Sequence, residues 1–192
     1  MKDLSRRAAL LLIDVQRGFE DPSWGRRNNP DAEANIARLL RLWRETGGPV
    51  LHVAHDSLSP SSPLRPDGAG NRPKPEAEPR EGEPVFRKHV NSAFIGTDLE
   101  QHLRLSGVWA LVVAGLTTNH CVSTTVRMAS NLGFETFVVA DATAAFEGRG
   151  LDGRTRPAAE VHDAALSDLQ GEFATVVETS ALVRAAGVAP AG

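Results

Sequence analysis

The chain has 192 residues, 41% of them hydrophobic and 23% charged, a length that allows one substantial core, so we expect one domain over residues 1–192. The net charge of −3 gives no electrostatic reason to expect nucleic acid or a membrane as partner, and no apolar stretch is long enough to span a bilayer. A single cysteine excludes an internal disulfide and fits a reducing compartment, so we expect a cytoplasmic protein.

Apolar runs typical of β-strands alternate with helical patterns from the start of the chain. The first run, residues 8–13, ends at Asp14. A helical repeat of apolar residues follows over about residues 31–46, and Gly47-Gly48 ends it. A second strand-like run covers residues 50–54.

The next segment, residues 57–84, is rich in Pro, Ser and Gly. A loop of this length inside a compact domain is usually functional or disordered. The same alternation of strands and helices continues on both sides, so we do not interpret the segment as a linker between domains. We expect an active-site flap or a subunit contact, since the segment is too long to pack against its own small domain alone. The chain is therefore expected to form a dimer or tetramer.

Beyond this loop the alternation resumes. A short strand over residues 84–88 precedes a helix over about residues 97–106, for which Thr97 and Glu100 form a capping box. The remaining expected elements are a strand over 109–115, the helix that contains Cys121, a strand over 136–141, a helix over 157–169 and a strand over 174–177. This order predicts an α/β fold, a three-layer α/β/α sandwich with a mainly parallel, Rossmann-like central sheet of about six strands.

Three chemically different side chains follow strand ends: Asp14, Lys88 and Cys121. Reactive groups of parallel sheets gather at the carboxyl ends of the strands, where a carboxylate, a cation and a thiol can act together. Taken singly, Asp14 could be a turn former, Lys88 a solvated surface lysine and Cys121 a small buried hydrophobe. Their joint placement favours covalent catalysis.

The local sequence around Cys121 predicts an activated thiol. Thr118 and Asn119 are good N-cap residues, which would put Cys121 in the first turn of a helix. The helix dipole stabilises negative charge there and can lower a thiol pKa to roughly 3.5–7.5. A dyad of Cys121 with His120 is not expected, because neighbours on a helix point about 100° apart.

Four ordered blocks make the chain recognisable. They are LIDVQRGF at 12–19, Lys88 with NSAF at 91–94, VAGLTTNHCV at 113–122 and VADAT at 139–143. With these blocks the chain resembles, from residue 9 to about residue 178, the isochorismatase-like cysteine hydrolase superfamily, which includes nicotinamidases, N-carbamoylsarcosine amidases and isochorismatases. The resemblance implies that Asp14, Lys88 and Cys121 form a catalytic triad. It also implies a cis peptide between Leu116 and Thr117, and an oxyanion hole made by the N–H groups of Thr117 and Cys121.

Members of this superfamily that act on isochorismate lack the nucleophilic cysteine, so Cys121 favours amide chemistry. We therefore expect a cysteine amidohydrolase that cleaves a small carboxamide, ureide or cyclic amide through a thioester. An isochorismatase-type vinyl-ether hydrolase and a non-catalytic scaffold that retains the fold are the alternatives.

The remaining site predictions concern substrate and metal. Candidate substrate contacts are Gln16, Phe19, Trp24, Asn91, Phe94 and Phe146, with core packing as the alternative for Phe94 and Phe146. His52, His55 and Asp56 resemble a metal cluster, but residues 52 and 55 of a strand point to opposite faces. The Asp-x-His spacing of nicotinamidases is also absent. We expect no metal and no cofactor.

Overall fold

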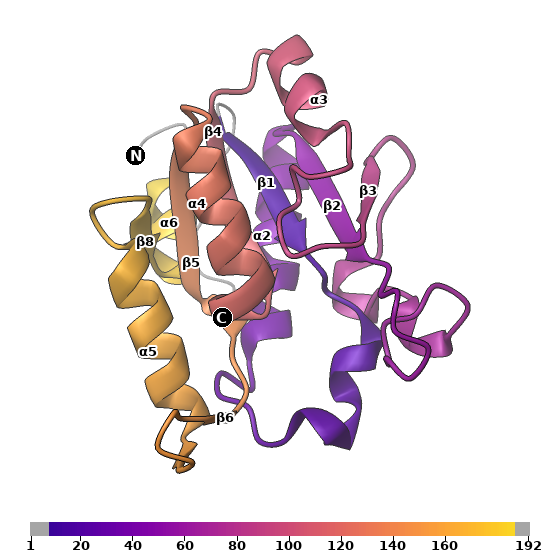
Figure 1. Ribbon diagram of the computed structural model, residues 1–192. Coiled ribbons are helices and arrows are strands. Elements are labelled where there is room, and N and C mark those ends of the chain that lie inside the picture. Colours follow the sequence, from indigo (N-terminus) through magenta and orange to yellow (C-terminus); the bar gives the residue numbers. More distant parts are fainter. Residues whose placement is uncertain (1–7, 187–192) are drawn as a thin grey trace.

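The structure is a computed structural model that describes residues 8–186, and its centre is a six-stranded sheet (Figure 1). The strands are β1 Ala8–Ile13, β2 Val50–His55, β3 Val85–Lys88, β4 Ala110–Leu116, β5 Glu135–Ala144 and β8 Thr175–Val177. They lie in the order β3-β2-β1-β4-β5-β8, and every neighbouring pair is parallel. The prediction of a parallel α/β fold is confirmed.

Helices cover both faces of this sheet. Helices α2 (Ala32–Thr46) and α6 (Thr179–Ala185) lie on one face, and α3 (Leu99–Leu105), α4 (Ser123–Asn131) and α5 (Ala158–Leu169) lie on the other (Figure 1). The central strand β1 is buried on both faces because its side chains alternate: Leu10 and Leu12 pack under α2, and Leu11 and Ile13 enter the opposite core.

Two small predictions about helix ends have different outcomes. Helix α2 ends at Gly47, whose φ of 71° is left-handed, so a glycine stops this helix as predicted. Helix α3 does not begin with the expected capping box. It starts at Leu99 after Asp98, and Thr97 Oγ1 accepts the N–H of Leu99 without a reciprocal bond from Glu100.

The chain order across the sheet reverses between β1 and β4, which are neighbours in the sheet although far apart in the sequence. At such a switch point the connections leave in opposite directions, and a crevice forms outside the carboxyl ends of the strands. A side chain at Gly115 would prevent this close pairing. Its Cβ would lie 2.1 Å from the carbonyl oxygen of Ile13, and its φ is +125°.

The segment of residues 57–84 packs onto its own domain, contrary to the expectation that it is too long to do so. Leu64, Asn71, Lys74 and Ala77 are buried, and the segment contains only two 3-10 turns, Ala69–Asn71 and Pro75–Ala77. The ammonium of Lys74 binds Glu33 of α2 at 2.8 Å. The argument for a subunit contact therefore loses its basis, and self-association stays a prediction.

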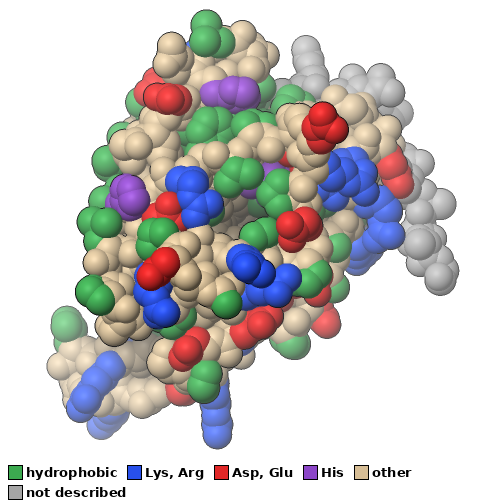
Figure 2. All heavy atoms as spheres, turned by 90° about the vertical axis from the view of Figure 1, so that its right-hand side faces the viewer, with side chains coloured by type: hydrophobic (Ala, Val, Ile, Leu, Met, Phe, Trp, Pro, Cys, Tyr) green, Lys and Arg blue, Asp and Glu red, His purple; other side chains and the backbone are tan. Residues whose placement is uncertain are grey.

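Figure 2 shows the side of the molecule on which β3 and residues 57–84 lie. Positive and negative side chains are interspersed on this face, without a large area of one sign. Within residues 8–186, no helix has the length and apolar character required to cross a membrane. A cytoplasmic location stays a prediction.

Candidate active site

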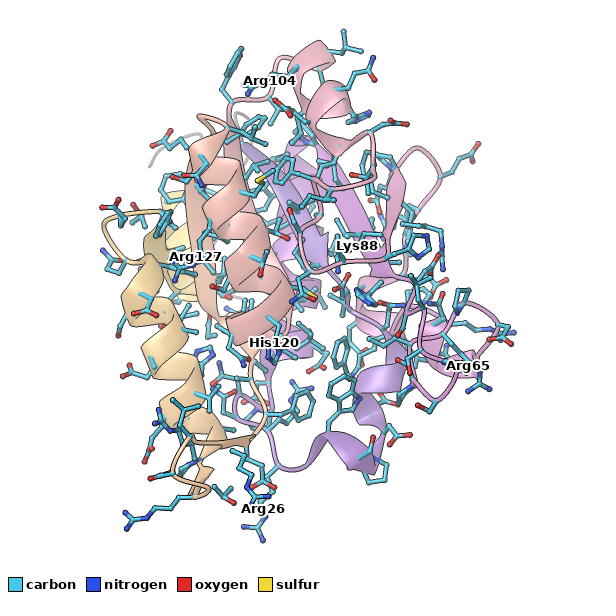
Figure 3. The ribbon with its side chains drawn as sticks, viewed as in Figure 1. Arg26, Arg65, Lys88, Arg104, His120 and Arg127 are labelled. Carbon is cyan, nitrogen blue, oxygen red and sulfur yellow. The ribbon has the colours of Figure 1, made fainter. Side chains whose placement is uncertain are left out.

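Asp14, Lys88 and Cys121 meet at the switch point between β1 and β4. Asp14 directly follows β1 with an uncommon φ of 50°, and Lys88 is the last residue of β3. Cys121 lies in a π-helical turn, Thr118–Val122, between β4 and α4. The ammonium of Lys88, which is labelled in Figure 3, is 2.6 Å from Asp14 Oδ2 and 3.3 Å from Cys121 Sγ. All three side chains are buried. The structure brings the three predicted residues together.

A fourth residue, His55, completes the surroundings of the Lys88 ammonium. Its Nδ1 lies 3.0 Å from Lys88 Nζ. An ammonium group has three N–H donors and no lone pair, so Nδ1 accepts this bond and the ring proton of neutral His55 lies on Nε2. Asp14, His55 and Cys121 thus supply one acceptor each. From the sequence, His55 could be interpreted only as a metal ligand or as a structural or substrate-facing histidine, because only the pairing of β2 with β3 brings it beside Lys88.

These three acceptors have the chemistry of metal ligands, and their atoms lie within 4.8 Å of one another. They form the only such group of three in the described part of the chain. The Lys88 ammonium binds all three, so the positive charge between these acceptors is that of a lysine side chain.

Burial controls the protonation of the site. Desolvation raises the pKa of Asp14 to about 6, against the lowering effect of Lys88, and its Oδ1 has no hydrogen-bond partner. Burial and the nearby Asp14 charge raise the pKa of Cys121 to about 12, although Lys88 acts in the opposite direction. The sequence-based prediction of a lowered thiol pKa is wrong, because the turn is buried and the Asp14 carboxylate lies beside the thiol.

The turn around Cys121 also differs from the predicted N-cap. Neither Thr118 nor Asn119 caps the helix: the residue before the turn is Thr117, and no side chain caps it. Thr118 Oγ1 instead bonds His162 Nδ1 of α5 at 2.8 Å, which ties the turn to that helix. His162 was missed because a single histidine in an amphipathic helix carries no signal in the sequence.

The backbone beside the thiol agrees with the resemblance. The peptide between Leu116 and Thr117 is cis. The N–H of Thr117 is not a donor in any of the hydrogen bonds between backbone groups described for residues 8–186. The oxyanion hole formed by Thr117 and Cys121 stays a prediction.

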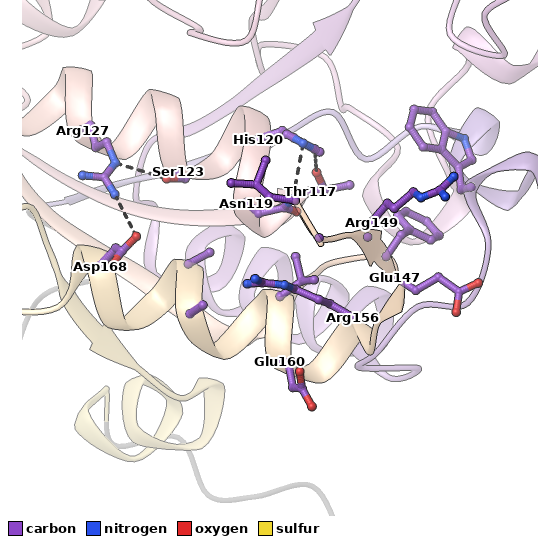
Figure 4. Close-up of a pocket in the computed structure, with 18 residues that line it drawn as sticks. Thr117, Asn119, His120, Ser123, Arg127, Glu147, Arg149, Arg156, Glu160 and Asp168 are labelled. Atoms are coloured by element: carbon purple, nitrogen blue, oxygen red, sulfur yellow. Dashed lines mark hydrogen bonds and ion pairs between the residues drawn. The ribbon is translucent and has the colours of Figure 1, made fainter. Parts of the chain in front are cut away.

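A cavity of about 810 Å³ adjoins Thr117 on the side of α5 and the ribbon β6 (Gly148–Arg149) and β7 (Thr155–Arg156) (Figure 4). Its lining includes two of the predicted substrate contacts, Trp24 and Phe146. Phe19 is buried beside them, with ring centroids 5.0 Å from Trp24 and 6.2 Å from Phe146. The three rings form one aromatic cluster, and Trp24 and Phe146 are the members that line the cavity.

The turn that contains Cys121 forms one part of the cavity lining. Asn119 and His120 line it, and the ring of His120 bonds the side chains of Thr117 and Asn119 (Figure 4). His120 therefore contacts its neighbours in the turn and the cavity, and it makes no hydrogen bond with Cys121 among the described contacts.

The other predicted substrate residues have different surroundings. Asn91 is exposed, and its Oδ1 lies 3.8 Å from Cys121 Sγ. Phe94 is buried in the core against Phe134 and is absent from the cavity lining. Gln16 is buried, and its amide group binds the backbone N–H and C=O of His55 and the C=O of Asn71. These contacts of Gln16 and Phe94 are structural, and a contact of either residue with substrate stays a prediction.

The resemblance of His52, His55 and Asp56 to a metal cluster does not extend to three dimensions. His52 bonds Glu83 at 2.9 Å, His55 bonds Lys88, and Asp56 pairs with Arg87. The predicted opposite orientation of residues 52 and 55 is confirmed, and the three side chains have separate partners.

Comparison with known proteins places these features in context. The isochorismatase domain family matches residues 8–181. The uncharacterized isochorismatase family protein YrdC of Bacillus subtilis is 44% identical, over 94% of this chain and 96% of its own. A solved structure of an isochorismatase family protein from Chromobacterium violaceum is 47% identical, covers 95% of this chain and 94% of its own, and has a TM-score of 0.91. Maleamate amidohydrolase of Pseudomonas putida is 29% identical, over 90% of this chain and 83% of its own.

Proposed function

Because the chain belongs to the isochorismatase family, we propose that it is a cysteine amidohydrolase acting on carbon–nitrogen bonds other than peptide bonds. The substrate class is a small carboxamide, ureide or cyclic amide. The observation that carries this proposal is the buried contact of Lys88 with both Asp14 and Cys121. The similarity to an amidohydrolase adds support.

In the first half of the reaction, the Cys121 sulfur attacks the amide carbonyl carbon while Asp14 takes the thiol proton. The charge of Asp14 is one cause of the raised thiol pKa, so this repulsion disappears as the proton moves to the carboxylate. The fixed Lys88 cation favours the developing thiolate. The N–H groups of Thr117 and Cys121 would donate to the oxygen of the tetrahedral intermediate.

In the second half, protonated Asp14 gives its proton to the departing nitrogen, and the carbon–nitrogen bond breaks to leave a Cys121 thioester. Ionised Asp14 then takes a proton from a water molecule that attacks the thioester carbonyl. The carbon–sulfur bond breaks, and the proton returns from Asp14 to sulfur. The products are an acid and ammonia or an amine, and the site is regenerated.

The cavity beside Thr117 supports a small substrate with an apolar body. Its volume of about 810 Å³ lies in the usual range for small-molecule sites. Trp24 and Phe146 would contact the apolar part of the substrate, while Asn119 and His120, which belong to the same turn as Cys121, line the cavity as well.

The decisive test is an ammonia-release screen over small amides, ureides and lactams, with dialysis against EDTA as a second arm. We expect turnover of at least one compound and no loss of activity after EDTA treatment, because Lys88 already binds the three acceptors of the only ligand cluster among the described residues. Loss of activity that zinc, manganese or iron restores would contradict a metal-independent mechanism. Activity on isochorismate alone would support the vinyl-ether alternative.

The pH dependence should reflect Asp14. Its raised pKa of about 6 means that the base is protonated in acid, so kcat/KM should rise as the pH increases through about 6 and then level off. Steady-state kinetics on a substrate from the screen measures this profile. A rate that stays constant from pH 4.5 to 7 would exclude Asp14 as the base.

A further inference from the structure

We infer that His55 is a positioning residue that holds the Lys88 ammonium within reach of the Cys121 sulfur. The role is distinct from that of the triad, since His55 acts only through Lys88. The importance of this role for catalysis rests on the proposed function, whereas the contact between His55 and Lys88 does not depend on it.

Strand pairing places His55 beside Lys88. Strands β2 and β3 are parallel, and His55 is paired with Lys88 in register, so both side chains leave the same face of the sheet. The distance of 3.0 Å between His55 Nδ1 and Lys88 Nζ follows from this register. His52, on the same strand, bonds Glu83 instead and serves as a natural comparison.

The backbone of His55 is held by a buried side chain. Gln16 Oε1 accepts the His55 N–H at 2.9 Å, and Gln16 Nε2 donates to the His55 C=O at 3.1 Å. Asn71 Nδ2 donates to the same carbonyl at 3.0 Å. These three hydrogen bonds fix the backbone at the end of β2, and the fixed backbone sets the position of the imidazole. The buried amide of Gln16, two residues after Asp14, therefore holds the backbone of His55 in place.

The three acceptors around Lys88 differ in strength, and this difference explains why the third one matters. Asp14 is charged and closest, at 2.6 Å, whereas the thiol is neutral and most distant, at 3.3 Å. His55 binds the ammonium from a third direction. Without it, one N–H of a fully buried cation has no partner, and attraction to the Asp14 carboxylate draws Nζ away from sulfur.

Alkylation of the thiol measures this effect without any substrate. The chain has one cysteine, so iodoacetamide labelling followed by mass spectrometry reports on Cys121 alone. Below the thiol pKa the rate follows the thiolate fraction, and one unit of pKa changes it about tenfold. The charged and titratable groups that act on His55 and Cys121 are Asp14, Asp56, Lys88 and His89, and all remain in every variant.

The experiment compares wild type, His55→Leu, His55→Asn and His52→Leu between about pH 7 and pH 10. We expect His55→Leu to react about tenfold more slowly at each pH, because leucine fills the space without accepting a hydrogen bond. Asparagine has an oxygen near the position of Nδ1, so His55→Asn should stay within about threefold of wild type. His52→Leu should match wild type. If His55→Leu does not fold, His55→Ala takes its place with the same expected loss.

Two results would contradict the inference. Wild-type alkylation of the Leu or Ala variant would show that the third acceptor is dispensable. Equal slowing of the Asn and Leu variants would show that the imidazole acts through its shape, which also overturns the inference. Failure of the amide screen would leave these labelling results unaffected, so the two proposals can fail separately.

Discussion

Cys121→Ala is expected to abolish amide turnover and leave the fold intact. The change removes the sulfur that forms the thioester, and neither Asp14 nor Lys88 can replace a nucleophile. We expect kcat to fall by at least about 10⁴-fold, as is usual when a covalent nucleophile is removed. Steady-state ammonia release on a substrate from the screen gives the rate, and circular dichroism with thermal unfolding reports on the fold.

Cys121→Ser is the matched control for the nucleophile. Serine keeps the shape of the side chain with oxygen in place of sulfur, but its hydroxyl is a much weaker nucleophile in the presence of a carboxylate base. This variant should therefore be almost as inactive as the alanine variant while unfolding at the wild-type temperature. Turnover by Cys121→Ala within a hundredfold of wild type would disprove the nucleophile assignment.

Lys88→Met should impair both the reaction and the folded state. Lys88 and Asp14 are completely buried, and breaking a buried ion pair by removing one partner typically costs about 3–5 kcal/mol. Loss of the cation also raises the pKa of the Cys121 thiol, because Lys88 is the group that lowers it. We expect at least a roughly hundredfold loss of kcat/KM together with slower alkylation of the thiol.

The stability loss of Lys88→Met should depend on pH. Burial already raises the pKa of Asp14 from 3.8 to about 6, so the folded wild type binds this proton more tightly than the unfolded chain does. Its stability therefore decreases as the pH rises through about 4 to 6. Without Lys88 the pKa of Asp14 rises further, and the decrease extends above pH 6. The difference from wild type should be largest at neutral pH and smallest below about pH 4.

Lys74→Met is the control for the removal of a buried lysine. Lys74 is also buried and pairs with Glu33 at 2.8 Å, but it lies in the 57–84 segment and not among the three site residues. It should lose stability and keep the wild-type alkylation rate. Urea unfolding at several pH values, with labelling in parallel, separates the two variants. A Lys88→Met protein as stable as wild type at neutral pH would show that the Asp14 carboxylate does not depend on this cation.

The architecture and the three central residues could be predicted from the order of the amino acids. Continuous apolar runs such as residues 8–13 are typical of strands buried on both faces, and their alternation with amphipathic helices indicates a parallel sheet. Because the carboxyl ends of parallel strands share one edge, Asp14, Lys88 and Cys121 could be placed together before any coordinates were known. These conclusions depend on local patterns and on topology, which the order of residues encodes directly.

The electrostatics of the site and its supporting contacts arise only in the folded chain. The pKa of Cys121 depends on burial and on the Asp14 carboxylate, which comes from another strand, so the helix-dipole argument from neighbouring residues predicted the wrong direction. The role of His55 depends on the pairing of β2 with β3. The role of Gln16 depends on the hydrogen bond between its side chain, just beyond β1, and the backbone of His55 at the end of β2. Residues 57–84 pack through the buried side chains of Asn71 and Lys74, whose partners lie far away in the sequence. Distances between such segments are set by packing, and no periodicity within either segment records them.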